Sequence, residues 1–121
     1  MELIRPGQMP VLSNPGVRST QFLNPANSAS ERITLTRVVV EPGAEQARHA
    51  HDTSEQIWIA LKGRATLLLK EGGSQLFVEG EVARFADGDV HGVVNDSGEP
   101  FEYLSATSPP IDFGYAYKDR G

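Results

Sequence analysis

The chain has 121 residues, a formal net charge of −5 and no cysteine. This length suits a single domain, and the lack of cysteine excludes disulfides, thiolate metal ligands and a cysteine nucleophile. A nucleic-acid partner is not expected, because the acidic composition offers no basic stripe. The opening segment MELIRPGQMP contains no signal sequence, and no stretch approaches the ~18 apolar residues of a membrane span. We therefore expect a cytoplasmic protein without membrane contact that acts on something small.

The first thirty residues are rich in proline and small polar residues, as in NPANSAS. They predict an extended arm over residues 1–30, with one short strand near QFL, that is available as a dimer contact. Residues 31–108 then carry roughly seven or eight short strands at about ten-residue spacing, with Gly or Asp at most breaks. This spacing predicts an all-β sandwich or barrel. Residues 109–121 are expected to form a tail that packs Phe113 and a tyrosine onto it.

The predicted strands follow one another closely. RITLTRVVVE, from Arg32 to Glu41, alternates and is rich in β-branched residues, and EPG ends it. QIWIALKG and RATLLLKEGG meet at a tight turn, and QLFVEGE, VARFADGD, VHGVVNDSGEP and FEYLSAT complete the series. IWIAL and TLLL are apolar at successive positions, which indicates that both strand faces are covered, by the arm or by a second subunit. We therefore expect a homodimer.

The three histidines indicate a metal site. His49 and His51 are two residues apart, so on a strand they project from the same face, close enough to share one ion. His91 stands at the start of another predicted strand, which can face the first pair across the interior. A lone strand histidine is more often a satisfied polar side chain, and so the grouping carries the prediction.

Around these histidines the chain resembles the cupin superfamily. The first family motif, G-x5-H-x-H-x(3–4)-E-x6-G, is matched by Gly43, His49, His51, the pair Glu55–Gln56 and Gly63. The second, G-x5-P-x-G-x2-H-x3-N, is matched by Gly80, Gly88, His91 and Asn95. Ala86 replaces the proline of the second motif, and we expect this change to loosen one turn and little else.

The resemblance implies a small single-domain antiparallel β-barrel, or jelly roll, with one divalent transition metal per chain held by His49, His51, His91 and a fourth ligand. Glu55 has the family's usual chemistry for that ligand. Gln56 has the family's closing spacing to Gly63, and strand phase puts it on the same face as Trp58. We prefer Gln56, as in small cupins that carry H-x-H-x4-Q, and keep Glu55 as the alternative.

A glutamine ligand has a chemical consequence. Three neutral imidazoles and a neutral amide leave the metal charge uncompensated, so the site favours an anionic ligand. Fe, Mn, Ni, Zn and Cu all suit such a set of nitrogen and oxygen ligands.

Other residues are candidates for the pocket. Trp58 is expected to face the interior, where it packs in the core or stacks on a substrate. Tyr103 supplies a general acid or packs. An inward-pointing arginine would clamp a carboxylate, and the candidates are Arg37, Arg48 and Arg84, although a solvated position is the commoner one for each.

The leading hypothesis is a metal-dependent enzyme acting on a small, anionic, oxygenated substrate. Isomerase or lyase chemistry on a sugar acid comes first, since the glutamine-ligated small cupins that the chain resembles include an enzyme converting an unsaturated uronate. Iron- or manganese-dependent dioxygenase chemistry comes second. The alternative is a non-catalytic cupin that senses or stores a metal or small ligand, because one fold hosts many functions.

Overall fold

The computed structural model describes residues 1–119, so the last two residues of the expected tail, 120–121, lie outside the described residues. The described strands are β1 (Val11–Asn14), β2 (Val17–Leu23), β3 (Thr34–Val40), β4 (Glu45–His49), β5 (Glu55–Lys62), β6 (Arg64–Leu69), β7 (Ser74–Val78), β8 (Val82–Phe85), β9 (His91–Val94) and β10 (Phe101–Ser108). Three short 3-10 helices accompany them: η1 (Pro6–Gln8), η2 (Lys70–Gly72) and η3 (Phe113–Ala116). In residues 1–119, no helix has the length and apolar character needed to cross a membrane.

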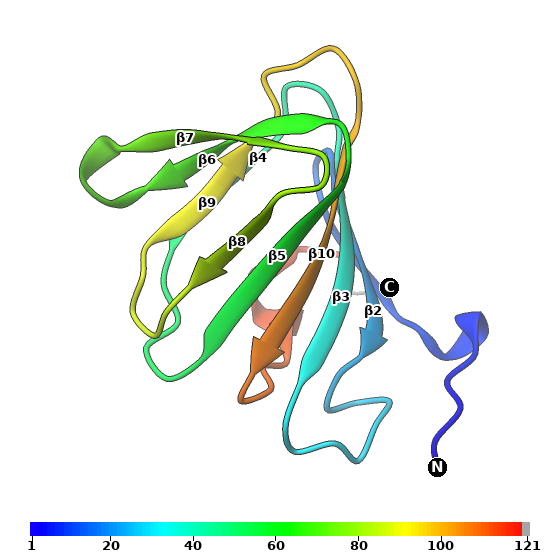
Figure 1. Cartoon of the computed structure of the whole chain (residues 1–121). Helices are drawn as coiled ribbons and strands as arrows, with labels where there is room; N and C mark the ends of the chain where they lie inside the picture. Colours follow the sequence, from blue (N-terminus) through cyan, green and yellow to red (C-terminus); the bar gives the residue numbers. More distant parts are fainter. Residues whose placement is uncertain (120–121) are drawn as a thin grey trace.

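Two antiparallel sheets form the barrel (Figure 1). One sheet has six strands in the order β1-β2-β3-β10-β5-β8, and the other has four in the order β4-β9-β6-β7. Strand β10 lies at the centre of the larger sheet, where it pairs with β3 over Phe101–Thr107 and with β5 over Glu102–Ser108. The prediction of an all-β, antiparallel barrel of jelly-roll type is confirmed.

The N-terminal segment differs from the expected arm. Strands β1 and β2 form a hairpin that belongs to the six-stranded sheet, and β2 pairs with β3 from Val17 to Leu23. The alternate residues Val17, Ser19 and Gln21 point inward and are buried. The prolines bound these strands instead of interrupting them, which is where a residue without a backbone N–H is tolerated.

The inner face of the six-stranded sheet is apolar at one end and polar at the other. Val38, Val40, Phe101 and Tyr103 pack there with Ala65, Leu67, Phe77 and Val93 of the opposite sheet. Toward the other end the inward side chains become Thr34, Thr36, Ser105, Thr107 and Gln56, all of them buried. A barrel interior filled by hydroxyl and amide groups must satisfy them with hydrogen bonds or with a ligand.

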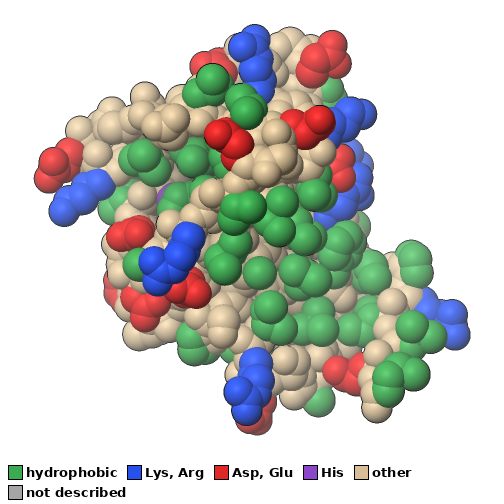
Figure 2. Space-filling model, in the orientation of Figure 1, with side chains coloured by type: hydrophobic (Ala, Val, Ile, Leu, Met, Phe, Trp, Pro, Cys, Tyr) green, Lys and Arg blue, Asp and Glu red, His purple; other side chains and the backbone are tan. Residues whose placement is uncertain are grey.

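The outer face of the same sheet is largely apolar. Hydrophobic side chains gather over β5, β10 and β3 in the space-filling view (Figure 2). Ile57 and Ile59 are only half-buried, and Leu61 is exposed. The N-terminal hairpin extends the sheet and does not cover this face, so the expected cover of IWIAL by an arm is wrong.

The C-terminal segment closes over one end of the barrel. Phe113 packs against the core and Tyr117 is buried. The Asn14 side-chain amide donates to the Ala116 carbonyl, and its oxygen accepts from the Lys118 backbone N–H. Ser13 and Asp119 exchange two backbone hydrogen bonds of 2.7 and 3.0 Å. The β1–β2 hairpin and the tail therefore hold each other at the barrel mouth.

Candidate metal centre

The three histidines meet inside the barrel. His49 is the last residue of β4, His51 lies two residues later in the loop to β5, and His91 opens β9. Their ring centroids are 4.4 to 5.4 Å apart, and one ligand nitrogen from each lies within 4.8 Å of the others. His51 is therefore beyond the strand, where the two-residue spacing had suggested a shared strand face. The rings still converge.

A bulge in β4 directs His49 inward. Gln46 pairs with Val93 and His49 with His91, so three steps along β4 match two along β9. Gly92 permits this close approach, because a Cβ atom there would lie 2.6 Å from the Gln46 carbonyl oxygen. An extra residue in one strand re-aims the side chains that follow it. As a result, both Gln46 and His49 line the pocket.

Backbone carbonyls determine which ring nitrogen is free. His49 Nδ1 lies 2.8 Å from the Ala47 carbonyl oxygen, and His91 Nδ1 lies 2.9 Å from that of Asp89. A carbonyl oxygen can only accept, so both Nδ1 atoms carry a proton, and the tautomer that this selects for a singly protonated ring has a bare Nε2. His51 Nε2 is buried without a hydrogen-bond partner. This tautomer pattern is the one that metal-ligating histidines adopt.

Gln56 aims its carbonyl oxygen at His91. The Trp58 indole N–H donates to Gln56 Oε1 over 3.0 Å, and Gln56 Nε2 donates to Thr107 Oγ1 over 3.0 Å. An indole can only donate, so the atom that faces it must be the amide oxygen. Gln56 Oε1 lies 2.9 Å from His91 Nε2. Two lone pairs therefore face each other, an arrangement that a cation between them would stabilise.

The residues of this cluster fit a divalent metal ion. The donor set offers three imidazole nitrogens and one amide oxygen, a combination that suits transition metals. Burial lowers the pKa of His91 to about 4, so at neutral pH a proton does not relieve the contact with Gln56. Burial also lowers the pKa of His51, with the neighbouring His49 acting in the same direction. Neutral imidazoles are the form that binds metal.

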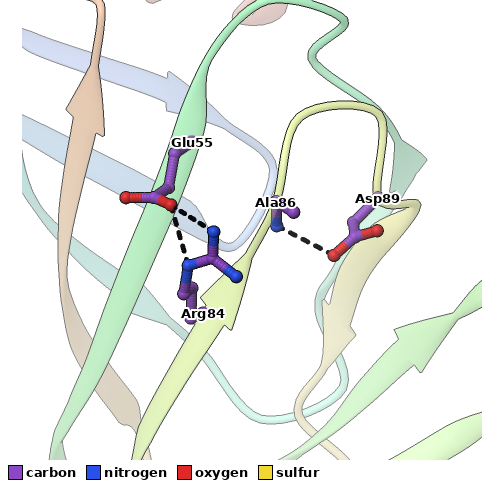
Figure 3. A network of polar contacts seen from close by, with 4 residues as sticks. All are labelled: Glu55, Arg84, Ala86 and Asp89. Atoms are coloured by element: carbon purple, nitrogen blue, oxygen red, sulfur yellow. Dashed lines mark hydrogen bonds and ion pairs between the residues drawn. The ribbon is translucent and has the colours of Figure 1, made fainter.

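The turn before β9 ties two of the histidines together. The Ala86 backbone N–H donates to Asp89 Oδ2 over 2.8 Å (Figure 3). The Gly88 N–H donates to the His51 carbonyl, and the Asp89 carbonyl accepts from His91. A proline at position 86 has no N–H and could not make the first of these bonds. The expectation that Ala86 loosens the turn stays a prediction, and the Asp89 carboxylate supplies a restraint that a proline at this position could not accept.

Glu55 lies on the outer side of β5. Its carboxylate pairs with the Arg84 guanidinium of β8 at 2.6 Å (Figure 3). Neighbouring residues of a strand point to opposite faces, so Gln56 is buried while Glu55 remains partly exposed. The structure brings Gln56 to the histidines and does not bring Glu55, the alternative ligand.

None of the candidate arginines pairs with the histidine cluster, although Arg48 lines the rim of the cavity beside it. Arg37 projects from the outer face of β3 and forms an ion pair with Glu102, and Arg84 pairs with Glu55. Arg48 donates to the backbone carbonyls of Leu69 and Gly73. Strand phase explains Arg37, because its neighbours Thr36 and Val38 take the inward positions. Arg37 and Arg84 thus take the outward positions that were expected to be the commoner ones, and each is paired with a glutamate there.

A cavity of about 820 Å³ opens beside the histidines. Trp58 lies in its wall, stacks on Tyr103 with ring centroids 4.2 Å apart, and contacts the His91 ring edge-on at 5.5 Å. Trp58 therefore packs in the core and lines the cavity, and substrate stacking by Trp58 stays a prediction.

Tyr103 is a poor proton donor for a substrate. Its hydroxyl donates to Gln46 Oε1, and burial raises its pKa well above 10. Gln46 Nε2 in turn donates to the Tyr117 hydroxyl over 3.2 Å. Gln46 and Tyr117 are pocket residues that the motif did not indicate, because they come from the bulge and from the tail. Gln46 and His49 are three residues apart, and on a regular strand such residues point to opposite faces. Only the bulge in β4 brings both side chains to the cavity, so the sequence did not indicate Gln46.

Burial of His91 predicts a pH-dependent stability for the metal-free protein. The unfolded chain protonates this ring near pH 6.5, whereas the folded chain does so only near pH 4. The unfolded state therefore binds more protons inside this window, and the free energy of unfolding falls as pH decreases through it. We expect a loss of about 2–3 kcal/mol from this residue. Urea denaturation of chelator-treated protein at pH 7.5 and 4.5 measures it, and a His91→Asn variant should show a correspondingly flatter dependence.

Comparison with known proteins was made on this fold and site. The Cupin domain family matches residues 36–107, more than half of the chain. A conserved protein with a double-stranded β-helix domain from Klebsiella pneumoniae subsp. pneumoniae MGH 78578 is similar, with a TM-score of 0.73, 25% identity, and 88% of this chain and 84% of that chain covered. KdgF from Halomonas sp. has a TM-score of 0.76 and 18% identity, with 93% and 96% covered.

A sugar phosphate isomerase of the cupin superfamily from Silicibacter pomeroyi DSS-3 has a TM-score of 0.68 and 27% identity, with 78% of this chain and 60% of that chain covered. No curated protein sequence matches the chain. The family match contains all three histidines, Gln56 and the strands that carry them. The chain belongs to the cupin family.

Proposed function

We propose that this protein is a metal-dependent enzyme that acts on a small sugar acid as an isomerase or as a lyase. The observation that carries this proposal is the pair of opposed lone pairs at Gln56 and His91, beside the unpartnered His51 Nε2. His49, His51, His91 and Gln56 would hold one divalent transition metal per chain. When bound, such an ion supplies Lewis-acid chemistry that polarises a substrate oxygen.

The chain's own residues define what this pocket selects. The four proposed ligands are neutral, so they leave the positive charge of a bound metal ion uncompensated. An anionic oxygen group on the substrate would offset that charge. Trp58 holds the Gln56 amide in one orientation and Phe113 packs edge-on against His51, which keeps water from that side of the ring. The similarity to a sugar phosphate isomerase at 27% identity supports isomerase chemistry.

The test begins with elemental analysis of the untagged protein, purified without chelator and scored per chain. About one equivalent of Fe, Mn, Ni, Zn or Cu is expected, followed by turnover of uronates and related sugar acids. If an Fe- or Mn-loaded sample takes up dioxygen, the result would favour dioxygenase chemistry over isomerisation. A loaded protein that binds sugar acids without turnover would support the sensing or storage alternative. A protein that takes up no metal on titration would overturn the proposal.

The two neighbouring candidates for the fourth ligand give a matched pair of variants. Gln56→Ala is expected to weaken metal binding by more than about 100-fold, because it removes a proposed ligand oxygen and loss of a residue that merely supports a ligand already costs about 10- to 100-fold. Glu55→Ala is expected to leave metal binding unchanged, since it removes only an exposed ion pair with Arg84. Competition against a fluorescent chelator measures both. The reverse order of effects would make Glu55 the ligand.

We also propose a homodimer through the outer face of the six-stranded sheet. Ile57, Ile59 and Leu104 form an apolar stripe there, and the ion pairs Arg37–Glu102 and Arg84–Glu55 border it (Figure 2). Each copy thus offers both signs of charge beside an apolar centre, which is what a self-complementary two-fold interface requires.

Light scattering after size exclusion is expected to give twice the chain mass of 13.1 kDa. Ile59→Lys should give the monomer mass, because it places a charge at the centre of the stripe. Leu76→Lys, on the exposed side of β7 in the other sheet, is the control and should leave the dimer intact. A monomeric wild-type protein would contradict this assembly.

A further inference from the structure

The interior of the cavity carries no fixed charge among residues 1–119. The charged residues that line it are Glu45, Arg48 and Lys118, and all three are exposed at its rim. Arg48 is already engaged by two backbone carbonyls. The rim therefore carries two cations and one anion, all of them exposed to solvent. A second anionic group on a substrate would therefore enter a wall that has no cation to pair with it.

Two residues with hydroxyl side chains line this cavity and have no hydrogen-bond partner for the hydroxyl among the described residues. Thr36 on β3 and Ser105 on β10 are direct cross-strand neighbours, both line the cavity, and both residues are at least 96% buried. Among the described residues, no hydrogen bond involves either side chain. Nearby hydroxyls on the same face are used: Thr34 bonds with Ile111, and Thr107 accepts from Gln56. The Thr36–Ser105 pair is therefore available to a ligand.

The pair lies within reach of a ligand that is anchored at the histidines. Ser105 is opposite Trp58, two residues further along β5 than Gln56, and Thr36 is one strand beyond. With the usual strand spacing and rise, the Cα atom of Gln56 is about 8 Å from that of Ser105 and about 12 Å from that of Thr36. A carbon chain of about six atoms, with side chains reaching from both ends, spans this separation.

We propose that Thr36 and Ser105 form a subsite for the neutral hydroxyl or carbonyl groups of the substrate. This inference rests on the proposed function, which puts the anionic end of the substrate at the histidines. The substrate is then a monocarboxylic, unphosphorylated sugar acid, with one negative charge at one end and an uncharged, hydroxylated body. An apolar body would displace water from both hydroxyls and leave them unpaired, and a terminal phosphate would be desolvated without a cation.

The experiment uses three six-carbon probes and isothermal titration of the metal-loaded protein. Gluconate has one carboxylate and a hydroxylated chain, hexanoate lacks the hydroxyls, and 6-phosphogluconate adds a dianion at the far end. We expect gluconate to bind roughly 10-fold or more tightly than either of the others, because each satisfied hydrogen bond contributes a factor of about 2 to 13. Ser105→Ala and Thr36→Val should each weaken gluconate binding by roughly 5-fold, and each should strengthen hexanoate binding because it removes a hydroxyl that hexanoate leaves unpaired.

The control variant is Thr20→Val, which removes a hydroxyl from the outer face of β2 and should change nothing. Metal content per chain is measured on every sample. A sample without metal would contradict the proposed function, whereas a metal-loaded sample tests the hydroxyl subsite alone. If the loaded protein does not bind gluconate, or binds hexanoate or 6-phosphogluconate at least as tightly, the subsite is overturned. Unchanged gluconate affinity in both hydroxyl variants, with circular dichroism like that of the wild type, also overturns it.

Discussion

Replacing His51 or His91 with alanine is expected to abolish stoichiometric metal binding while leaving a folded barrel. His51 Nε2 is a buried atom with no hydrogen-bond partner, and His91 Nε2 faces the Gln56 oxygen at 2.9 Å. Loss of a residue that merely supports a ligand costs about 10- to 100-fold in metal affinity, so loss of a ligand should cost more than about 100-fold. Elemental analysis after dialysis measures the metal, and circular dichroism measures the fold.

The chain offers no fourth histidine as a control, so an exposed polar residue serves. Gln75 lies on β7, away from the cavity, and Gln75→Ala should retain one equivalent of metal. Full metal content in both histidine variants would show that the cluster is not the binding site. Loss of metal in only one of them would leave that residue as a ligand and exclude the other.

Gly92→Ala is expected to disrupt the same centre without touching a ligand. The added Cβ would lie 2.6 Å from the Gln46 carbonyl oxygen and 2.9 Å from the Ala47 carbonyl carbon, and both are backbone atoms that cannot rotate away. Strand β4 must then move, and His49, whose Nδ1 bonds with the Ala47 carbonyl, moves with it. We expect a loss of about 1–3 kcal/mol in the free energy of unfolding. Metal affinity should fall by roughly 10- to 100-fold.

Gly98→Ala is the matched control, since a Cβ there meets nothing within 4 Å. Denaturant titration of metal-free protein gives the stability difference, and chelator competition gives the affinity. If Gly92→Ala matches Gly98→Ala in both measurements, β4 does not hold His49 through this contact.

Much of the site could be predicted from sequence because its spacing is local. The two motifs fix the order of His49, His51 and His91, and strand phase alone distinguishes Gln56 from Glu55. The family match spans these residues, and the barrel topology agrees with the predicted fold. Alternation along a strand has a period of two residues, so any short apolar-polar pattern predicts which side chains face inward.

Features that depend on non-local geometry could not be predicted in the same way. The bulge in β4 changes which residues face the cavity, and nothing in EQARH marks it. The β1–β2 hairpin was missed because its prolines suggest an irregular arm, although they stand at strand ends. Arg37 was a plausible pocket residue only until the phase of β3 was fixed by the burial of Thr36 and Val38.

The interlocked hairpin and tail bear on how the protein should be handled. Tyr117 and Lys118 line the cavity, and Asp119 is paired with Ser13, so the C-terminal end of the described chain is part of the pocket mouth. Met1, by contrast, is fully exposed and lies away from the barrel (Figure 1). An affinity tag joined within a few residues after Asp119 would follow closely on the part of the chain that borders the ligand entrance and would compete with the Ser13 pairing. Such a tag would change ligand affinities for reasons unrelated to the site, whereas an N-terminal tag would leave the entrance unobstructed.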